Sequence, residues 1–358
     1  MNRYQKKRTL QRALPLILTL ALFFQGMIHA HHTSITFDEG PHLAVGYTTL
    51  RTGDFRLQPV HIHPPLANVL AALPVSLQRD LPDPRTVGGW EISSLSAITD
   101  SVVWQYPHPR RIAIAGRVPI LGLGAILAAL VFRWAKDRGG IIAGLTAMAF
   151  LVFDPNVVAH SSLVTTDVAA VTLMLLSLYL TDRWVLRKRT NGHRRNPKRR
   201  YITSVGIGLV VGLAQLTKVS ALLLIPVIIS SIVLKGWAGS KALWKSARYV
   251  IPSSILLIAT TGLVVWAGYG FEVRSVSGLS AWPVPAATHV EIFRSLRQHY
   301  DLCHPTFAAG KLSRQGWWWY FPLAFLIKTP LPFLILLLTT GVALMIYEPV
   351  DRLKEAGL

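Results

Sequence analysis

The feature that most constrains the fold is a series of apolar segments with basic clusters between many of them. We identify about eight such segments, at residues 13–30, 112–134, 141–153, 168–184, 202–216, 221–234, 249–269 and 321–347. A helix needs about 20 apolar residues to cross the hydrocarbon core of a bilayer, and the third to sixth segments are shorter than that. The chain is 51% hydrophobic and only 15% charged, which is typical of a polytopic membrane protein. The pattern therefore predicts an all-α membrane protein with about eight transmembrane helices.

The distribution of charge predicts how the chain is oriented. The formal net charge is +20, and the basic residues cluster near the N-terminus and at 133–138, 183–200 and 235–248. Basic loops stay in the cytoplasm. We therefore expect a multi-pass protein of the inner (plasma) membrane, with both termini cytoplasmic and with external loops at 31–110 and 270–319. The run at 183–200 could also indicate a nucleic-acid site, but a basic loop between two spans already explains it.

Two apolar segments need separate treatment. The first has a basic start and ends in Ile28-His29-Ala30, so a cleaved signal peptide is the alternative to a membrane span. The stretch Leu66–Leu77 inside the first loop is too short to cross a bilayer and contains Pro74. It is typical of an interfacial or re-entrant helix. Such a helix would hold the first loop against the membrane surface.

A pair of carboxylates, Asp38 and Glu39, follows directly after the first apolar segment. Ionisable side chains near the membrane are costly and often functional. A carboxylate there could accept a proton from a molecule whose reaction partner is anchored in lipid. The alternative is that both side chains only solvate the start of a loop.

Other candidates lie near the ends of the predicted spans. His63 precedes Pro64-Pro65, which restrict the backbone and hold this histidine in a fixed place, or simply stiffen a loop with a solvated histidine. Asp167 follows Thr165-Thr166 at the expected start of a helix. Capping of that helix explains these residue types without excluding a second role for Asp167.

Two cations lie within apolar runs. Arg117 is placed inside the second segment and Lys328 inside the eighth. A cation in such a position must reach the membrane surface or find an anionic partner. A phosphate group would be a suitable partner for each.

The sequence gives little support for a metal or a disulfide. Cys303 is the single cysteine, so no internal disulfide or thiolate cluster is possible. Several histidines fall outside the membrane in the predicted topology, but their spacing matches no compact metal-binding motif. We therefore expect no required cofactor, and a divalent metal remains possible without support from the spacing.

The order of these motifs resembles the dolichyl-phosphate-mannose–protein mannosyltransferase family. That family belongs to the GT-C class of membrane glycosyltransferases, which also includes bacterial aminoarabinose transferases, and the closer resemblance is to the bacterial branch. The matching segments are Phe37-Asp38-Glu39, His63-Pro64-Pro65-Leu66, Gly116-Arg117-Val118-Pro119, Ser162–Asp167, Leu216–Ser220 and Lys328–Pro332. Together they span most of the chain, from about residue 30 to 340.

The resemblance implies a function and a set of roles. The chain would be a single GT-C-like module over 1–358 that moves a mannose-like hexose from a polyprenyl-phosphate donor to a hydroxyl of a protein or lipid glycan, with inversion at the anomeric carbon. Asp38 would be the general base, with Glu39 as the alternative. Arg117 would neutralise the phosphate, and Asp167 would orient the substrates. His63 and Lys328 complete the expected substrate-binding set.

Two points remain open at the level of sequence. Related proteins commonly continue beyond an eighth span, so this chain could be a fragment without further spans or a soluble domain, or a minimal member. Paired carboxylates and intramembrane cations also suit an ion-coupled transporter or lipid flippase, and a non-catalytic membrane scaffold is a third possibility. Polar residues that gather at one face, without an internal repeat, favour the transferase.

Overall fold

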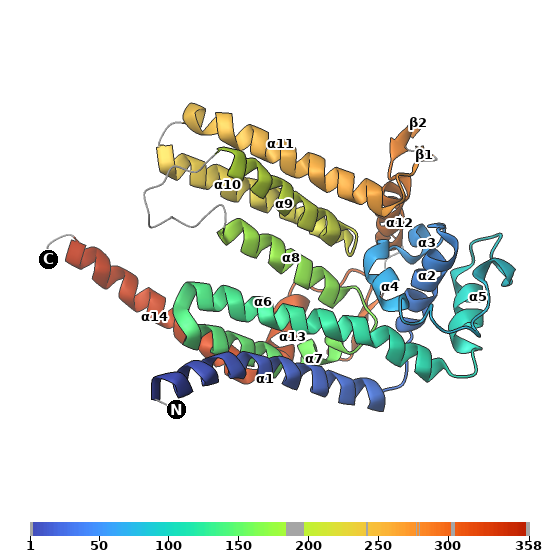
Figure 1. Cartoon of the computed structure of the whole chain (residues 1–358), viewed down its shortest axis with the longest axis horizontal. Helices are drawn as coiled ribbons and strands as arrows, with labels where there is room; N and C mark the ends of the chain where they lie inside the picture. The colour runs from blue at the N-terminus through green and yellow to red at the C-terminus, as the bar shows by residue number, and fades with distance from the viewer. Residues whose placement is uncertain are drawn as a thin grey trace.

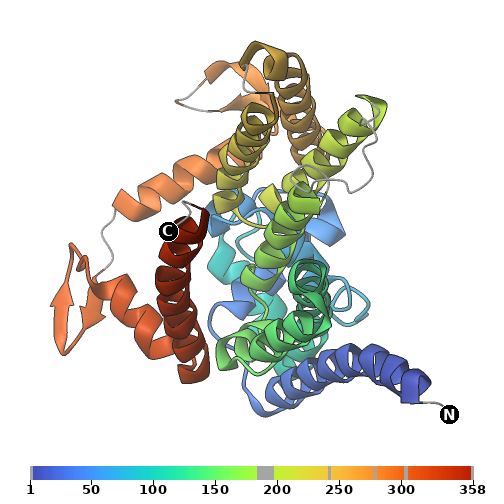
Figure 2. The ribbon, with the colours of Figure 1, turned by 90° about the vertical axis from the view of Figure 1, so that its left-hand side faces the viewer.

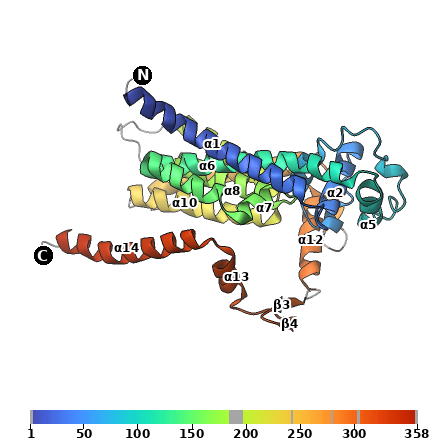
Figure 3. The same ribbon diagram turned by 90° about the horizontal axis from the view of Figure 1, so that it is seen from below.

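Most helices of the protein run roughly along one axis, and its two long loops lie at the same end of them (Figure 1). The computed structural model describes residues 3–183, 197–240, 243–276, 278, 280–301 and 305–355. Cys303 and most of the basic run at 183–200 lie outside the described residues. The described ends of the chain lie at the opposite end of the helices from the first loop (Figures 1 and 3).

Helices make up most of the described chain. The elements are α1 (Arg3–His32), α2 (Glu39–Thr52), α3 (Gln58–His61), α4 (Pro65–Ala72), η1 (Pro84–Thr86), α5 (Leu95–Thr99), η2 (Asp100–Trp104), α6 (Pro109–Val152), α7 (Pro155–Ser161), α8 (Asp167–Thr181), α9 (Pro197–Gln215), η4 (Val219–Leu223), α10 (Leu224–Ser240), α11 (Leu243–Gly268), β1 (Val273–Val276), β2 (Ser280–Pro285), α12 (Ala287–Asp301), β3 (Thr306–Ala308), β4 (Lys311–Ser313), α13 (Tyr320–Lys328) and α14 (Leu331–Glu355).

Helix α6 is a hairpin of two antiparallel helices. Its backbone leaves the helical conformation at Gly140, where φ is 80°, a value that glycine adopts without steric cost. Beyond this reversal, Gly144 packs against Phe132 and Lys136 of the preceding helix. The segments predicted at 112–134 and 141–153 are thus two separate passes along the bundle.

The prediction of about eight spans is not confirmed by length and composition. Among the described residues, three helices are long and apolar enough to cross a membrane: Ala13–His32, Pro109–Val152 and Val250–Gly268. The bent pair Tyr320–Lys328 and Leu331–Ile346 would make a fourth if it formed one span. Three other apolar helices, at 167–181, 201–215 and 219–234, are shorter. The structure therefore supports a helical membrane protein without fixing the number of spans.

The eighth predicted span is not one straight helix. Helices α13 and α14 meet at an angle of 112°. Pro330 causes the break, because proline disfavours the helical conformation in the residue before it, and Thr329 is extended at φ −82° and ψ 131°. Lys328 therefore ends a helix instead of lying inside one. Both helices stand to one side of the bundle (Figures 2 and 3).

The second loop departs from the all-α expectation. It contains two short antiparallel hairpins, β1–β2 and β3–β4, together with the unpredicted helix α12. In the first hairpin Val273 pairs with Pro285, and in the second Thr306 pairs with Ser313. Proline-rich and β-branched residues at 273–285 suit an extended edge better than a helix. The fold is therefore mainly, but not entirely, helical.

The first loop is a packed unit with its own core. Residues of α2, α4, α5, η2 and the first part of α6 form one buried cluster, which includes Leu43, Tyr47, Ile98 and Ile120. Helix α4 coincides with the first part of the predicted stretch 66–77, but it ends at Ala72. It lies so close to α2 that a Cβ added at Gly46 would stand 2.0 Å from the Asn68 carbonyl oxygen. Its predicted position on the membrane surface stays a prediction.

Helices α9 and α11 approach each other closely at two glycines. A Cβ at Gly208 would stand 2.6 Å from the Leu257 carbonyl oxygen, and one at Gly212 would stand 2.6 Å from Val264. Small residues four apart allow this approach, which is a common basis for helix association in membranes.

This packing predicts that Gly208→Ala destabilises the protein by about 1–3 kcal/mol, because the added methyl group forces the two backbones apart. The matched control is Gly262→Ala on α11, where nothing lies within 4 Å of an added Cβ. The control should be neutral or slightly stabilising, because alanine favours helix more than glycine does. Thermal unfolding in detergent measures both. Equal midpoints for the two variants would contradict the packing.

Candidate active site

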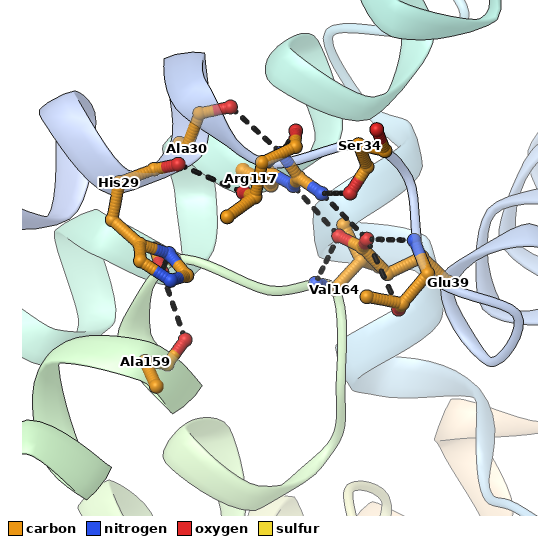
Figure 4. Close-up of polar contacts among 10 residues, drawn as sticks. His29, Ala30, Ser34, Glu39, Arg117, Ala159 and Val164 are labelled. Atoms are coloured by element: carbon orange, nitrogen blue, oxygen red, sulfur yellow. Dashed lines mark hydrogen bonds and ion pairs between the residues drawn. The ribbon is translucent and has the colours of Figure 1, made fainter.

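Arg117 and Glu39 form a buried ion pair (Figure 4). The Arg117 Nε and Nη2 atoms donate to the two carboxylate oxygens of Glu39 at 2.8 and 2.7 Å. Both side chains are fully buried. Arg117 lies near the start of α6, whereas Glu39 is the first residue of α2. The pair thus joins the first loop to the bundle.

The remaining polar atoms of the pair are also satisfied. Arg117 donates to the backbone carbonyls of Ala30 at 2.7 Å, Thr33 at 3.1 Å and Ser34 at 2.9 Å. Glu39 accepts from the backbone N–H groups of Thr36 and Val164, at 2.8 and 2.9 Å. These contacts fix the end of α1, the turn at 33–36, the start of α2 and the segment before α8 relative to one another.

This arrangement changes the roles that we expected for the two residues. Sequence analysis assigned Arg117 to a donor phosphate and named Glu39 as an alternative base. Neither side chain reaches the surface, and each already has its full set of protein partners. The observed geometry instead gives them the role of holding the neighbouring residues in place, because a phosphate or a hydroxyl could reach them only if the pair opened.

The Glu39 carboxylate is held in its ionised form. Burial raises the pKa of Glu39, but the Arg117 hydrogen bonds and the Thr36 and Val164 N–H groups outweigh burial and lower the pKa below 4.5. A carboxylate with a lowered pKa stabilises the fold above its ordinary pKa. That contribution is lost as the pH falls through the lowered pKa.

Asp38 is exposed, in contrast to its neighbour. It occupies the N-cap position of α2, but its side chain makes no capping hydrogen bond. The preceding Phe37 is 82% exposed. The buried pair at Glu39 and Arg117 therefore presents a carboxylate at the surface, at a fixed point of the backbone.

A second carboxylate, Asp167, forms an ion pair with Lys218. The Lys218 Nζ atom lies 2.5 Å from Asp167 Oδ1, and the two side chains are 37% and 41% exposed. The His160 Nδ1 atom lies 3.7 Å from the other Asp167 oxygen. Asp167 is the first residue of α8, and the N-cap is Thr166 without a side-chain bond. The Asp167 side chain thus binds Lys218 instead of capping the helix.

Lys218 is a site residue that sequence analysis left out of the predicted set. It lies in the turn between α9 and η4, within the segment Leu216–Ser220 of the resemblance, but nothing in its spacing connects this turn to residues near 65. The connection is a backbone hydrogen bond of 2.8 Å from Leu66 N–H to the Leu216 carbonyl. Through this bond the turn lies beside the His63–Leu66 segment.

Three histidines pack against one another in the same region. The ring centroids of His42 and His61 are 4.4 Å apart, and those of His42 and His63 are 5.2 Å apart. Burial lowers the pKa of His63 to about 4, and the nearby His42 and Lys218 act in the same direction. His63 is therefore neutral at physiological pH.

His42 shows that several elements meet here. Burial lowers its pKa, while a hydrogen bond to Asn68 and the carboxylates of Asp38 and Asp167 act in the opposite direction. Both carboxylates therefore lie within electrostatic reach of one imidazole. His42 thus packs against His63 and lies within electrostatic reach of Asp38 and Asp167, which belong to three separate segments.

Lys328 does not join this group. Its side chain is exposed, and its backbone carbonyl accepts a 2.9 Å hydrogen bond from Asn156 of α7. The described part of the chain contains no group of three His, Cys, Asp or Glu side chains arranged to hold a metal ion. A reaction without a metal stays a prediction.

The buried pair predicts a large stability loss when one partner is removed. Arg117→Met should lower the free energy of unfolding by about 3–5 kcal/mol, because it leaves the Glu39 charge buried without a cation. The control Arg133→Met removes an arginine on the same helix whose side chain is 51% exposed, and it should cost less than about 1 kcal/mol. The double variant Glu39→Gln/Arg117→Met should recover part of the loss. Thermal unfolding in detergent measures all three, and similar midpoints for Arg117→Met and Arg133→Met would refute the prediction.

Comparison with known proteins supports the resemblance over part of the chain. No curated protein and no solved structure matches. Residues 114–272 match the family model of dolichyl-phosphate-mannose-protein mannosyltransferase. This segment contains Arg117, Asp167 and Lys218, whereas Asp38, His42 and His63 lie before it. The resemblance drawn from the motifs is therefore confirmed over residues 114–272, where the chain is similar to this family of membrane glycosyltransferases.

Proposed function

We propose that this chain is an inverting glycosyltransferase that moves a mannose-like hexose from a polyprenyl-phosphate donor to a hydroxyl of a protein or lipid glycan. The observation that carries the proposal is that His42, at the loop end of an apolar helix bundle, packs against His63 and lies within electrostatic reach of the carboxylates of exposed Asp38 and of Asp167, which is paired with Lys218. The family match over residues 114–272 supports the class of reaction.

Asp38 is the proposed general base. It is exposed, makes no capping bond and is held by the buried pair at the next residue. As the acceptor oxygen attacks the anomeric carbon, the Asp38 carboxylate takes the hydroxyl proton. The bond between the anomeric carbon and the phosphate oxygen breaks, and polyprenyl phosphate leaves with the bonding electrons. The sugar develops partial positive charge in the transition state, which nearby carboxylates stabilise.

Lys218 is the proposed partner of the donor phosphate. Arg117, our expectation from sequence, is enclosed by protein partners, whereas the Lys218 side chain is partly exposed. Asp167 holds the ammonium group in place before the donor arrives. A phosphate then shares the cation, and charge-assisted hydrogen bonds stabilise the charge that develops on the leaving group.

The hydrophobic tail of such a donor needs an apolar surface, and the structure contains a suitable hollow. It lies between α6 and the pair α13–α14 and has a volume of about 1090 Å³. Its lining is mainly apolar, with Phe150, Phe325 and Phe333 among its residues. We place the isoprenoid chain along this face of the bundle.

The site is proposed to face away from the cytoplasm at the inner (plasma) membrane. The basic residues Arg133, Lys136 and Arg138 flank the reversal of α6, at the end of the bundle opposite the first loop (Figure 1). Basic ends of membrane helices stay in the cytoplasm. This orientation puts the termini in the cytoplasm and the site outside.

A transporter and a scaffold remain the alternative functions. Transporters place polar residues near the bilayer midplane, whereas Asp38, Asp167 and Lys218 lie at the ends of helices. An assay with radiolabelled polyprenyl-phosphate mannose separates the three. A transferase releases polyprenyl phosphate, a flippase moves the intact donor across a vesicle, and a scaffold binds it without either result.

The base assignment predicts that Asp38→Asn lowers the rate of sugar transfer by about 10²–10⁴-fold, because the amide cannot accept the proton. The matched control is Glu91→Gln, an exposed carboxylate of the same loop, which should transfer at the parental rate. Thermal unfolding of both variants checks the fold. Transfer by folded Asp38→Asn at the parental rate would rule out Asp38 as the base.

The phosphate assignment predicts that Lys218→Met raises the KM for the donor by about 10- to 100-fold through the loss of a charge-assisted hydrogen bond. Lys218→Arg, which keeps the charge, should retain more affinity. Lys136→Met at the other end of the bundle serves as the control and should leave KM unchanged. The assignment fails if Lys218→Met and Lys136→Met have the same KM.

A further inference from the structure

The three packed histidines are linked by one amide. The His42 Nδ1 atom lies 2.7 Å from Asn68 Oδ1, and Asn68 Nδ2 lies 3.3 Å from His61 Nδ1. His42 is 6%, His61 8% and Asn68 1% exposed. The amide is therefore enclosed between two imidazoles, and each of its two polar atoms faces a ring nitrogen.

This link determines the tautomer of each ring. A carbonyl oxygen only accepts a hydrogen bond, so the His42 Nδ1 atom must carry a proton. An amide nitrogen only donates, so the His61 Nδ1 atom must be unprotonated. In the neutral rings His42 therefore has a lone pair on Nε2, and His61 has an N–H group there.

The His42 Nε2 atom is available to a ligand. Among the described residues it has no hydrogen-bond partner, and it is not one of the fully enclosed polar atoms without a partner. His42 lies one turn after Asp38 on α2, and its N–H donates to the Asp38 carbonyl at 3.4 Å. The His42 ring thus lies in the same region as the Asp38 and Asp167 carboxylates, both of which act on its pKa.

We propose that His42 Nε2 accepts a hydrogen bond from a ring hydroxyl of the transferred sugar, and that Asn68 is a positioning residue that keeps this nitrogen unprotonated. The proposal rests on the glycosyltransferase function given above and adds the residue that recognises the sugar. A hydroxyl donor is the fitting ligand class, because a neutral imidazole in this tautomer offers only an acceptor at Nε2.

The surroundings of His42 are consistent with a neutral acceptor. His61 and His63 pack against its ring, and the charges of Asp38, Glu39 and Asp167 act on it. In the proposed function Asp38 accepts the proton, and Asp167 binds the Lys218 ammonium group. An uncharged nitrogen in the same region can bind a hydroxyl without competing for Lys218.

Two substitutions at His42 test the contributions of its two nitrogens separately. The Asn side chain reaches only the Nδ1 position, so His42→Asn keeps the contact with Asn68 and loses the outward acceptor. The Gln side chain reaches the Nε2 position, so His42→Gln keeps an acceptor there. With polyprenyl-phosphate mannose as the probe, we expect His42→Gln to retain most of the parental kcat/KM and His42→Asn to lose about tenfold. Equal values for the two variants, or the reverse order, would overturn the proposal.

Donors that lack one hydroxyl identify the partner. Of the 2-, 3-, 4- and 6-deoxymannosyl donors, one should lose about tenfold with the parental protein and lose little more with His42→Asn, because the two changes remove the same hydrogen bond. Additive losses for every deoxy donor would show that His42 binds no sugar hydroxyl.

The role of Asn68 is tested by pH. Asn68→Asp keeps an acceptor for His42 Nδ1 but adds a negative charge that favours protonation of the ring. Protonated His42 has no lone pair at Nε2. As the pH is lowered, transfer by this variant should therefore begin to fall at a higher pH than transfer by the parental protein. Coincident pH profiles would contradict the positioning role. If the parental protein releases no polyprenyl phosphate at any pH, the proposed function itself fails, which is a separate result.

Discussion

The buried contact between Arg117 and Glu39 is the interaction on which the site depends. Two charges without access to water are tolerated only when each is paired and fully hydrogen-bonded, and here five backbone groups supply the remaining bonds. Those groups come from the end of α1, the turn that follows, and the segment before α8. The need to satisfy one guanidinium thus fixes four parts of the chain near the loop end of the bundle.

The division of labour between Asp38 and Glu39 follows from this constraint. The two carboxylates are adjacent in sequence, yet one is fully buried and the other exposed. Helix α2 begins between them, so their side chains leave the backbone in different directions. The buried member fixes the backbone, and the exposed member is left free for chemistry. For the proposed base Asp38, a backbone held in this way means that little entropy is lost on reaching the working geometry.

The region around the candidate site combines paired charges with neutral histidines. The half-exposed Lys218 is paired with Asp167, and burial keeps the pKa of His63 near 4. The region therefore contains carboxylates, one paired ammonium group and neutral imidazoles. Such a set suits a phosphate leaving group, a sugar with developing positive charge and hydroxyl groups that need neutral partners.

The sequence by itself determined the membrane class and the reversal between the second and third apolar segments, and it singled out Asp38, His63 and Asp167 as candidates, because hydrophobic length and local motifs act over short distances. Only the tertiary structure decided that Arg117 pairs with Glu39, that Lys218 binds Asp167 and that Asn68 joins two histidines. Each of these contacts connects residues that are between 7 and 78 positions apart. Pro330 could be read from the sequence, but the angle of 112° between α13 and α14 was seen only in the structure. Periodicity cannot reveal which distant side chains meet, since that depends on how the helices fold against one another.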